Sequence, residues 1–385
     1  SFILDYTNFE NFKDIVNQKI IDINTLSPNL PPVEIANYYG IIFDLPMALI
    51  ECLFNIKSSQ NYFFLRHLSN FTIFFVSGIF FFKILKLRTA NKIISLMGAS
   101  MYLLTPKAFG NSFFDGKDLF FLSILTITFY YYFAFERNKN FKSLLLLAIF
   151  SSFATSSRIF GLMLPIVFVF LISLEFLNLS IKKEKIFKII FIYLFLFSIS
   201  LFAHWPYMWS LNINDISSFF SPFQVHGSFK VFFSGEFYES KFLPINYLPK
   251  WIFISTPIYF LILFLLGYLF YLKRLFFRFE KIKEISPNND LWRGNKEKFD
   301  LINFFCIFQV IVVYLTFNIN LIKGWTHFIF LNYFLIYFSS IGIYILFINF
   351  RKNKNILIGL TTIFLILSTE LIYKLIIYHP YQSLY

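Results

Sequence analysis

The sequence predicts an all-α polytopic membrane protein with about ten transmembrane helices and additional interfacial helices. Three observations support this. Of the 385 residues, 57% are hydrophobic and 14% are charged, at a mean hydropathy of +0.65, whereas a soluble protein of this length needs more polar surface. Ten apolar stretches follow one another along the chain, each approaching the ~20 residues that span a bilayer. Lysine and arginine gather in alternate loops, as in multi-pass membrane proteins.

The ten apolar stretches start after a polar N-terminal region. Segment 144–156 is the shortest, and Pro165 in the next stretch is a kink that membrane helices tolerate. The stretches cover residues 70–86, 93–106, 119–135, 144–156, 159–174, 189–203, 251–272, 301–322, 328–350 and 355–369.

The region before residue 70 is expected to lie outside the membrane. Segment 37–56 is apolar but contains Asp44 and Glu51, which fit an interfacial helix better than a spanning one. We therefore expect one membrane domain over residues 1–385 in four parts. These are an external segment with interfacial helices (1–69), transmembrane helices with an external 115–118 loop (70–203), an external loop (204–250) and C-terminal transmembrane helices (251–385).

The alternate loops predict which ends of the helices are cytoplasmic. One set of loops holds 22 Lys and Arg residues and the other holds seven, so the first set is expected in the cytoplasm. The external side then receives the 115–118 loop, Arg158, the 204–250 loop and the 323–327 turn. The cytoplasmic loops account for the net charge of +13, so no nucleic-acid partner is expected.

Other features of the composition narrow the function classes. The 60 Phe and 23 Tyr residues are explained by codon bias in an AT-rich genome and by lipid-facing positions, where bulky side chains are favourable. They are not interpreted as an aromatic cofactor site. Cys52 and Cys306 lack CxxC or His-rich neighbours, so no disulfide framework or cysteine metal site is expected. No GxxxxGK[ST] motif occurs, which excludes a P-loop ATPase.

The 115–118 loop places Asp115, Lys117 and Asp118 between two apolar stretches. Charges in such a position are costly unless they are solvated, paired or in use. The structural interpretation is that Asp115 caps the following helix and Asp118 favours the positive end of its dipole. The functional interpretation makes Asp118 and Asp115 catalytic acids, as a general base or a metal or substrate ligand, while Lys117 holds a phosphate.

Two arginines are expected on the same side as this loop. Arg158 either forms an ion pair with Asp118 or Asp115, or presents its guanidinium fork to a phosphate oxygen. Arg66 either extends to the membrane surface or binds the same phosphate. Their shared side, rather than either residue alone, indicates a site.

Two later segments add polar groups to this side. Lys323 and His327 flank a Gly-Trp-Thr turn, which suits an anionic ligand. Tyr247 lies in the external loop together with Glu236 and Glu239, where acceptor contact and plain solvation are both open. Polar residues that converge on one membrane face predict a binding site there.

At these positions the chain resembles the GT-C membrane glycosyltransferases, in the group of protein O-mannosyltransferases and aminoarabinose transferases (glycosyltransferase family 39-like). The matching segments keep their order over roughly residues 35–330. They read NYYGIIFDLP (37–46), LRHL (65–68), TP (105–106) with SFFDGKD (112–118), RIFG (158–161), WPYMW (205–209), NYLPKW (246–251) with TP (256–257), and GWTH (324–327).

The resemblance implies an enzyme that transfers a sugar from a polyprenyl phosphate on the external face, usually with inversion. Asp118 matches the acid of the family's Lys-Asp loop, Arg158 an arginine near the lipid phosphate, and His327 a histidine of the turn. The implied partners are the bilayer, the lipid-linked sugar and a glycan, lipid or protein acceptor, and a divalent cation stays open as a cofactor. The expected donor-binding residues are Lys117, Arg158, Arg66, Lys323 and His327.

The chain also departs from the family pattern. The family's first spanning helix and the acidic motif of its first external loop are not found, so we expect an N-terminally truncated chain. Asp5, Glu10 and Glu34 are the acids that could substitute, and Glu34 is assigned to the acceptor side together with Tyr247. Thr326 stands where relatives usually carry arginine, and Asp115 where many carry asparagine.

The sequence thus predicts a membrane glycosyltransferase of the bacterial inner membrane and cell envelope, with its site facing the periplasm or a lumen. One alternative is a transporter or flippase for a lipid-linked or anionic solute, which would carry charges at mid-helix. Such charges are nearly absent here. The other alternative is a non-catalytic membrane scaffold, in which Asp118 and Arg158 would merely pair.

Overall fold

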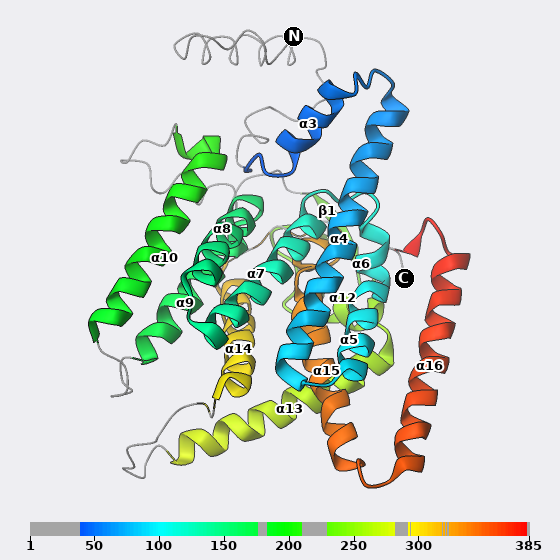
Figure 1. The fold of residues 1–385 in the computed structure, drawn as a ribbon. Helices are drawn as coiled ribbons and strands as arrows, with labels where there is room; N and C mark the ends of the chain where they lie inside the picture. Colours follow the sequence, from blue (N-terminus) through cyan, green and yellow to red (C-terminus); the bar gives the residue numbers. More distant parts are fainter. Residues whose placement is uncertain are drawn as a thin grey trace.

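The computed structural model describes residues 39–175, 183–209, 229–281, 292, 294–317, 319, 321 and 323–382. Within these residues the chain is a bundle of helices that run back and forth between two ends (Figure 1). Seven of these helices are long and apolar enough to cross a membrane, and three shorter apolar helices accompany them. The predicted all-α polytopic class is confirmed, while the count of ten spans is not.

The helices have the following bounds. They are α3 (Asp44–Leu53), α4 (Ser59–Thr89), α5 (Lys92–Leu104), α6 (Pro106–Asn111), α7 (Asp118–Asn138), α8 (Phe141–Ser157), α9 (Met163–Leu174), α10 (Lys183–His204), α12 (Tyr247–Ser255), α13 (Ile258–Lys281), α14 (Gly294–Thr316), α15 (Leu331–Asn349) and α16 (Lys354–Ile377). Short 3₁₀ helices are η1 (Ile159–Leu162), η3 (Pro206–Trp209) and η6 (Thr326–Phe328).

Several predicted bounds were wrong, and three of them have the following outcomes. Helix α4 begins at Ser59 rather than at residue 70, because Ser58 caps it by accepting a hydrogen bond from the Asn61 N–H (3.2 Å). Stretch 251–272 is two helices, α12 and α13. The break falls before Pro257, because a proline disfavours helical geometry in the residue before it. Helix α14 ends at Thr316 rather than at 322.

The two ends of the bundle carry different residues, and we name them accordingly. The site end carries the 115–118 loop, Arg158 and η6, and the basic-loop end carries the turns 90–91, 139–140 and 350–353 (Figure 1). Successive helices alternate in direction, so the segments predicted to share a side do share an end.

Helix α7 lies at the centre of the bundle, and 83% of its apolar window is buried. It packs against α4 and α8, and its aromatic side chains stack on distant helices. The Phe129 ring lies 4.5 Å from that of Tyr333, and the Phe133 ring lies 4.0 Å from that of Phe299. Much of the high phenylalanine content therefore fills the protein interior as well as facing lipid.

Helices α13 and α15 cross with their backbones in contact. A Cβ atom added at Gly267 would collide with the carbonyl oxygen of Phe338, and one added at Gly342 would collide with that of Leu263. Small residues allow such close helix approach in membrane proteins.

A short hairpin was not predicted within the 204–250 loop. Strands β1 (Lys230–Phe233) and β2 (Glu236–Glu239) pair antiparallel. Ser234 and Gly235 both have positive φ angles, 54° and 94°, as the two-residue turns favoured in hairpins require. Strands of four residues are too short to produce a clear alternating pattern in the sequence, which is why the hairpin was missed.

Candidate functional site

The 115–118 loop is held from both sides. Asp115 Oδ1 accepts hydrogen bonds from the backbone N–H groups of Lys117 (3.2 Å) and Asp118 (2.9 Å), just where α7 begins. Asp115 therefore contacts the start of the helix as predicted, although the N-cap residue itself is Lys117. From α4, the buried Asn70 donates through Nδ2 to the carbonyl oxygens of Ser112 (2.9 Å) and Asp115 (3.0 Å). The loop is therefore fixed before any ligand binds.

Asp118 holds two basic side chains from distant segments. Its Oδ1 lies 2.7 Å from Arg158 Nη2, and its Oδ2 lies 3.1 Å from His327 Nδ1. Arg158 follows the last residue of α8, and His327 belongs to η6. The Asp118–Arg158 pair that the structural interpretation predicted is therefore present, and the structure adds His327 to it.

Tyr39 covers the basic side chains, a contact that the sequence analysis missed. Its hydroxyl accepts a hydrogen bond from Arg158 Nη1 (3.1 Å), and Lys117 Nζ lies 4.1 Å from the centre of its ring. The next residue, Gly40, donates its backbone N–H to Ser156 O (2.8 Å), and a Cβ atom there would collide with the Ser156 side chain. In the sequence, the available sign of this contact was Gly40, which follows two tyrosines.

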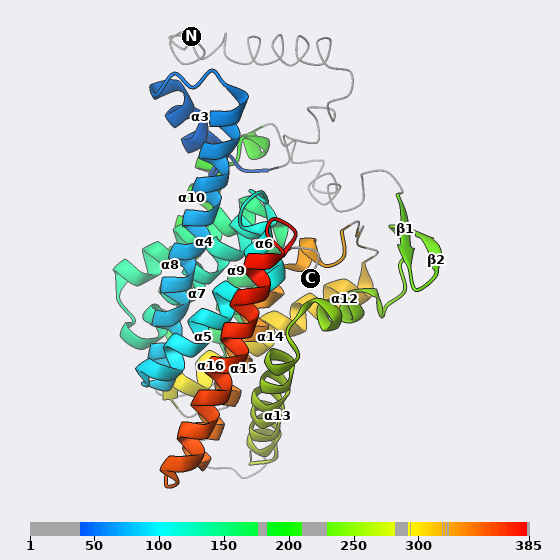
Figure 2. The same cartoon turned by 90° about the vertical axis from the view of Figure 1, so that its right-hand side faces the viewer.

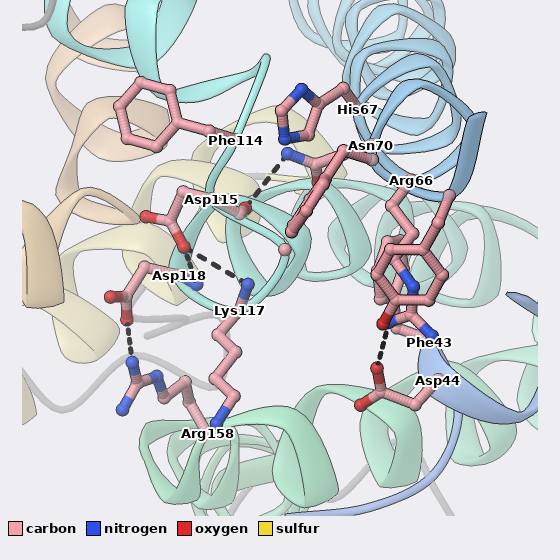
Figure 3. A pocket seen from close by; sticks show the side chains of 13 residues that line it. Phe43, Asp44, Arg66, His67, Asn70, Phe114, Asp115, Lys117, Asp118 and Arg158 are labelled. Carbon is pink, nitrogen blue, oxygen red and sulfur yellow. Dashed lines mark hydrogen bonds and ion pairs between the residues drawn. The ribbon is translucent and has the colours of Figure 1, made fainter. Parts of the chain in front are cut away.

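A pocket of about 460 Å³ opens beside these residues. Figure 3 shows the Asp118–Arg158 pair at one edge of the pocket and Arg66 with Asp44 at the other. Aromatic and charged side chains alternate around it, a mixture that suits a ligand with both polar and ring surfaces. Its lining is Phe43, Asp44, Tyr62, Phe63, Arg66, His67, Asn70, Phe114, Asp115, Gly116, Lys117, Asp118 and Arg158.

The electrostatics of the pocket shift the pKa values of Asp115 and Arg158. Burial, and then the nearby Asp118 carboxylate, raise the pKa of Asp115 to about 6. Burial opposes the charge of Arg158, but Asp118, Tyr39 and Asp115 outweigh it and hold the Arg158 pKa above its usual value. Within the described residues, Asp115 Oδ2 and Arg158 Nε have no hydrogen-bond partner. The pocket can therefore accept a proton near neutral pH and bind an anion.

Arg66 is paired at the far edge of the pocket. Its Nε donates to Glu51 Oε1 and its Nη1 to Asp44 Oδ1, each at 2.8 Å. The two acids that argued against a spanning helix in segment 37–56 thus both belong to the short helix α3, and they tie α3 to α4. A donor-binding role for Arg66 stays a prediction.

Tyr247 supports the turn that carries His327. Its hydroxyl accepts a hydrogen bond from the Gly324 N–H (3.2 Å), and Gly324 has a positive φ of 60° that favours glycine. The fully buried Trp325 donates through Nε1 to Ser255 Oγ (2.6 Å). Tyr247 therefore positions the turn.

The remaining predicted residues have simpler outcomes. Lys323 is exposed at the start of the turn, and Glu34 lies outside the described residues. No group of three or more His, Cys, Asp or Glu side chains in the described part of the chain is placed to hold a metal ion. Asp115 Oδ2 has no hydrogen-bond partner in the described residues, so this carboxylate oxygen could contact a divalent cation.

The fold and the site define a class: a polytopic helical membrane protein with a charged pocket at one end of its helices. Residues 44–217 match the family model described as dolichyl-phosphate-mannose-protein mannosyltransferase. The match confirms the resemblance to GT-C glycosyltransferases and indicates a membrane glycosyltransferase. It includes Arg66, Asp118 and Arg158 but ends before His327. No curated protein and no solved structure matches the chain significantly.

Proposed function

We propose that the protein transfers a sugar from a polyprenyl-phosphate donor to an acceptor hydroxyl, in the pocket beside Asp118. The observation that carries this proposal is the contact of Asp118 with both Arg158 and His327 next to a 460 Å³ pocket. This cluster lies where the apolar helices end. A lipid-linked donor has its phosphate at that level, with its chain among the helices.

The basic residues supply charge for the departing phosphate. Arg158 can present two N–H groups to one phosphate, and Lys117 lies beside it at the Tyr39 ring. His327 reaches the same place from η6, and Lys323 precedes it at the turn. Groups that are fixed before the reaction stabilise charge that develops on a leaving group.

The two acids, Asp118 and Asp115, have different roles in the proposed reaction. Asp118 keeps Arg158 and His327 in place, while Asp115, with its pKa of about 6, takes the proton of the acceptor hydroxyl. The acceptor oxygen bonds to the anomeric carbon, the bond from that carbon to the phosphate oxygen breaks, and the proton ends on the carboxylate. An acid of the N-terminal region, Asp5, Glu10 or Glu34, would share this role.

The site end faces the outside of a bacterial plasma membrane in this proposal, because the basic loops gather at the opposite end. A nucleotide is not needed there, since the lipid phosphate is the leaving group. The sugar is a hexose or pentose, and the acceptor is a glycan, a lipid or a protein of the cell envelope.

The test is sugar transfer in membranes from a labelled pool of polyprenyl-phosphate sugars. Asp118→Asn should lower the transfer rate by about 100-fold or more at normal membrane insertion, because Arg158 and His327 lose the carboxylate that positions them for the departing phosphate. Glu370→Gln, a matched change on the lipid-facing α16, should leave it unchanged. Equal rates for Asp118→Asn and wild type would remove Asp118 from the chemistry. If wild type transfers no sugar from any donor, a transporter or a scaffold becomes the better explanation.

A further inference from the structure

The β1–β2 hairpin exposes an aromatic pair on its outer face. Phe232 and Phe237 are opposite each other in the strand register, and their ring centres lie 5.1 Å apart. They are 61% and 72% exposed. Lys230, opposite Glu239, lies on the same face. Two adjacent exposed phenylalanines are unusual unless something covers them.

The inner face of the hairpin is packed against α12. Phe233 contacts Tyr247 with ring centres 4.8 Å apart, and Lys250 Nζ donates to Ser234 Oγ (2.7 Å). The hairpin and α12 thus form one unit, which we call the surface element (residues 229–255). Figure 2 shows it beside the bundle, level with the site end of α16, and α12 lies across the direction of α13.

Exposed apolar residues recur along the chain from the hairpin to a candidate span. Phe242 and Ile245 follow the hairpin, Phe253 and Ile254 continue along α12, and the exposed apolar residues of α13 come next, namely Ile258, Ile262, Leu265 and Leu269. Helix α13 is long and apolar enough to cross a membrane, and only 22% of its apolar window is buried. Lipid around α13 would therefore extend to the level of α12, which directly precedes it in the chain.

The surface element is also joined to the turn that carries His327. Ser240, at the base of the hairpin, accepts a hydrogen bond from the Leu321 N–H through its carbonyl oxygen (3.2 Å). Tyr247 and Ser255, from the same element, bond the Gly324 N–H and the Trp325 indole. Three hydrogen bonds thus tie residues 321–325 to the surface element.

We propose that the surface element rests in the headgroup layer of the membrane at the site end, with Phe232 and Phe237 in the lipid, and that this contact steadies the turn bearing His327. Aromatic side chains with neighbouring lysines, here Lys230 and Lys241, are typical of this layer. A second protein on the hairpin would not account for the exposed apolar residues that continue along α12 into α13. The relevance of the turn to catalysis rests on the proposed function, but the contact itself does not.

The contact can be tested by fluorescence quenching in the full-length protein. Phe237→Cys would be labelled with an environment-sensitive dye in a Cys52→Ser background, because Cys306 is buried. In phosphatidylcholine–phosphatidylglycerol vesicles, a nitroxide near the lipid headgroup should quench this label several-fold more than aqueous iodide does. A label at Lys352→Cys, in the exposed turn at the basic-loop end, is the control and should show the reverse. Iodide quenching at residue 237 equal to the control would overturn the proposal.

The link to the turn has its own measurement, which needs no activity. Phe232→Ser with Phe237→Ser should speed amide hydrogen exchange in residues 321–328 several-fold in vesicles, and leave it close to wild type in detergent micelles. Phe141→Ser, an exposed phenylalanine at the basic-loop end, should change neither. Unchanged exchange in vesicles would refute the steadying effect. Faster exchange in both media would show a packing role and refute the part assigned to lipid.

Discussion

The two ends of the bundle both contain buried ion pairs, yet they are built differently. At the basic-loop end, Asp300 accepts two hydrogen bonds from Arg88 (2.7 Å each), one from Arg274 (2.9 Å) and one from Tyr337 (2.8 Å). The Arg88 and Asp300 side chains are only 4% and 2% exposed. Both oxygens of this carboxylate are used.

A second cluster of ion pairs lies at the same end. Lys298 of α14 contacts Glu136 of α7 and Glu175, just after α9, and Lys139 adds a bond to each acid at 2.8 and 3.0 Å. The cavity described at this end, beside Arg274 and Arg278, measures about 10 Å³, which leaves little space for a ligand.

The site end combines its ion pairs with open space. Asp118 and Arg158 are 7% and 20% exposed, and their pocket measures about 460 Å³. In the described residues, Asp115 Oδ2 and Arg158 Nε still lack partners. Buried charge alone therefore does not identify a site in a membrane protein. Charge that borders a pocket and keeps free hydrogen-bonding atoms does.

Loss of a basic side chain at each end gives the largest expected contrast in sugar transfer. Arg158→Met should lower sugar transfer about 100- to 1,000-fold, the usual effect of losing one fixed donor to developing charge, because the phosphate loses its fork. Arg158→Lys should recover part of the rate, since it restores charge but not geometry. Lys92→Met, exposed at the basic-loop end, is the control. The measurement is the initial rate of sugar transfer per correctly folded molecule. The amount of folded protein is taken from size-exclusion profiles. Full activity in Arg158→Met would make its pair with Asp118 purely structural.

A carboxylate change at the basic-loop end should act on stability instead. Asp300→Leu leaves Arg88 buried without a carboxylate, which should cost about 3–5 kcal/mol. The double variant Arg88→Met with Asp300→Leu should recover most of this loss, because neither charge is then left alone. Thermal unfolding in micelles measures both. Transfer per folded molecule should match wild type, and a specific loss of transfer would show that this end also takes part in the reaction.

The pH dependence should separate activity from stability at the site end. Asp115 must be ionised to accept a proton, so with a pKa of about 6 transfer should fall about tenfold from pH 7 to pH 5. The folded state holds this proton more tightly than the unfolded chain, so the contribution of Asp115 to stability is present at low pH and lost as pH rises through about 6. Acid should therefore slow transfer without unfolding the site. The Asp115→Asn variant should transfer sugar slowly, and its rate should not fall between pH 7 and pH 5. If the fall is unchanged in this variant, another group causes it.

The smallest effect is expected at the outer edge of the pocket. Arg66→Met removes the pairs with Asp44 and Glu51, and Asp44 is 62% exposed, so the stability cost should be about 1 kcal/mol or less. Hydrogen exchange should rise in α3 and transfer should change little. A large rise in the KM for the donor would instead assign Arg66 to phosphate binding.

The sequence was sufficient to predict the helical bundle and part of the site. A pair of Arg158 with Asp118 or Asp115 was one of the two interpretations that the sequence offered, because alternate loops share a side and polar residues there need partners. The Asp300 cluster was not predicted, because Arg88 lies far from it in sequence within a loop already explained as basic. Tyr39 was missed for a similar reason, since its contacts depend on how residues 39–41 cross the end of α8. Pairings of this kind depend on tertiary packing, which periodicity does not encode.

The glycine contact between α13 and α15 has a mechanical consequence. Backbone atoms cannot move aside by changing rotamer as side chains can, so the crossing at Gly267 and Gly342 makes a stiff joint. Helix α13 follows α12 and helix α15 follows η6 along the chain, so the crossing holds the two helices that adjoin the His327 turn and its support. Helix α3, at the opposite edge of the pocket, is held to α4 by the side-chain pairs with Arg66. One side of the site is thus anchored through backbone contacts and the other through side chains.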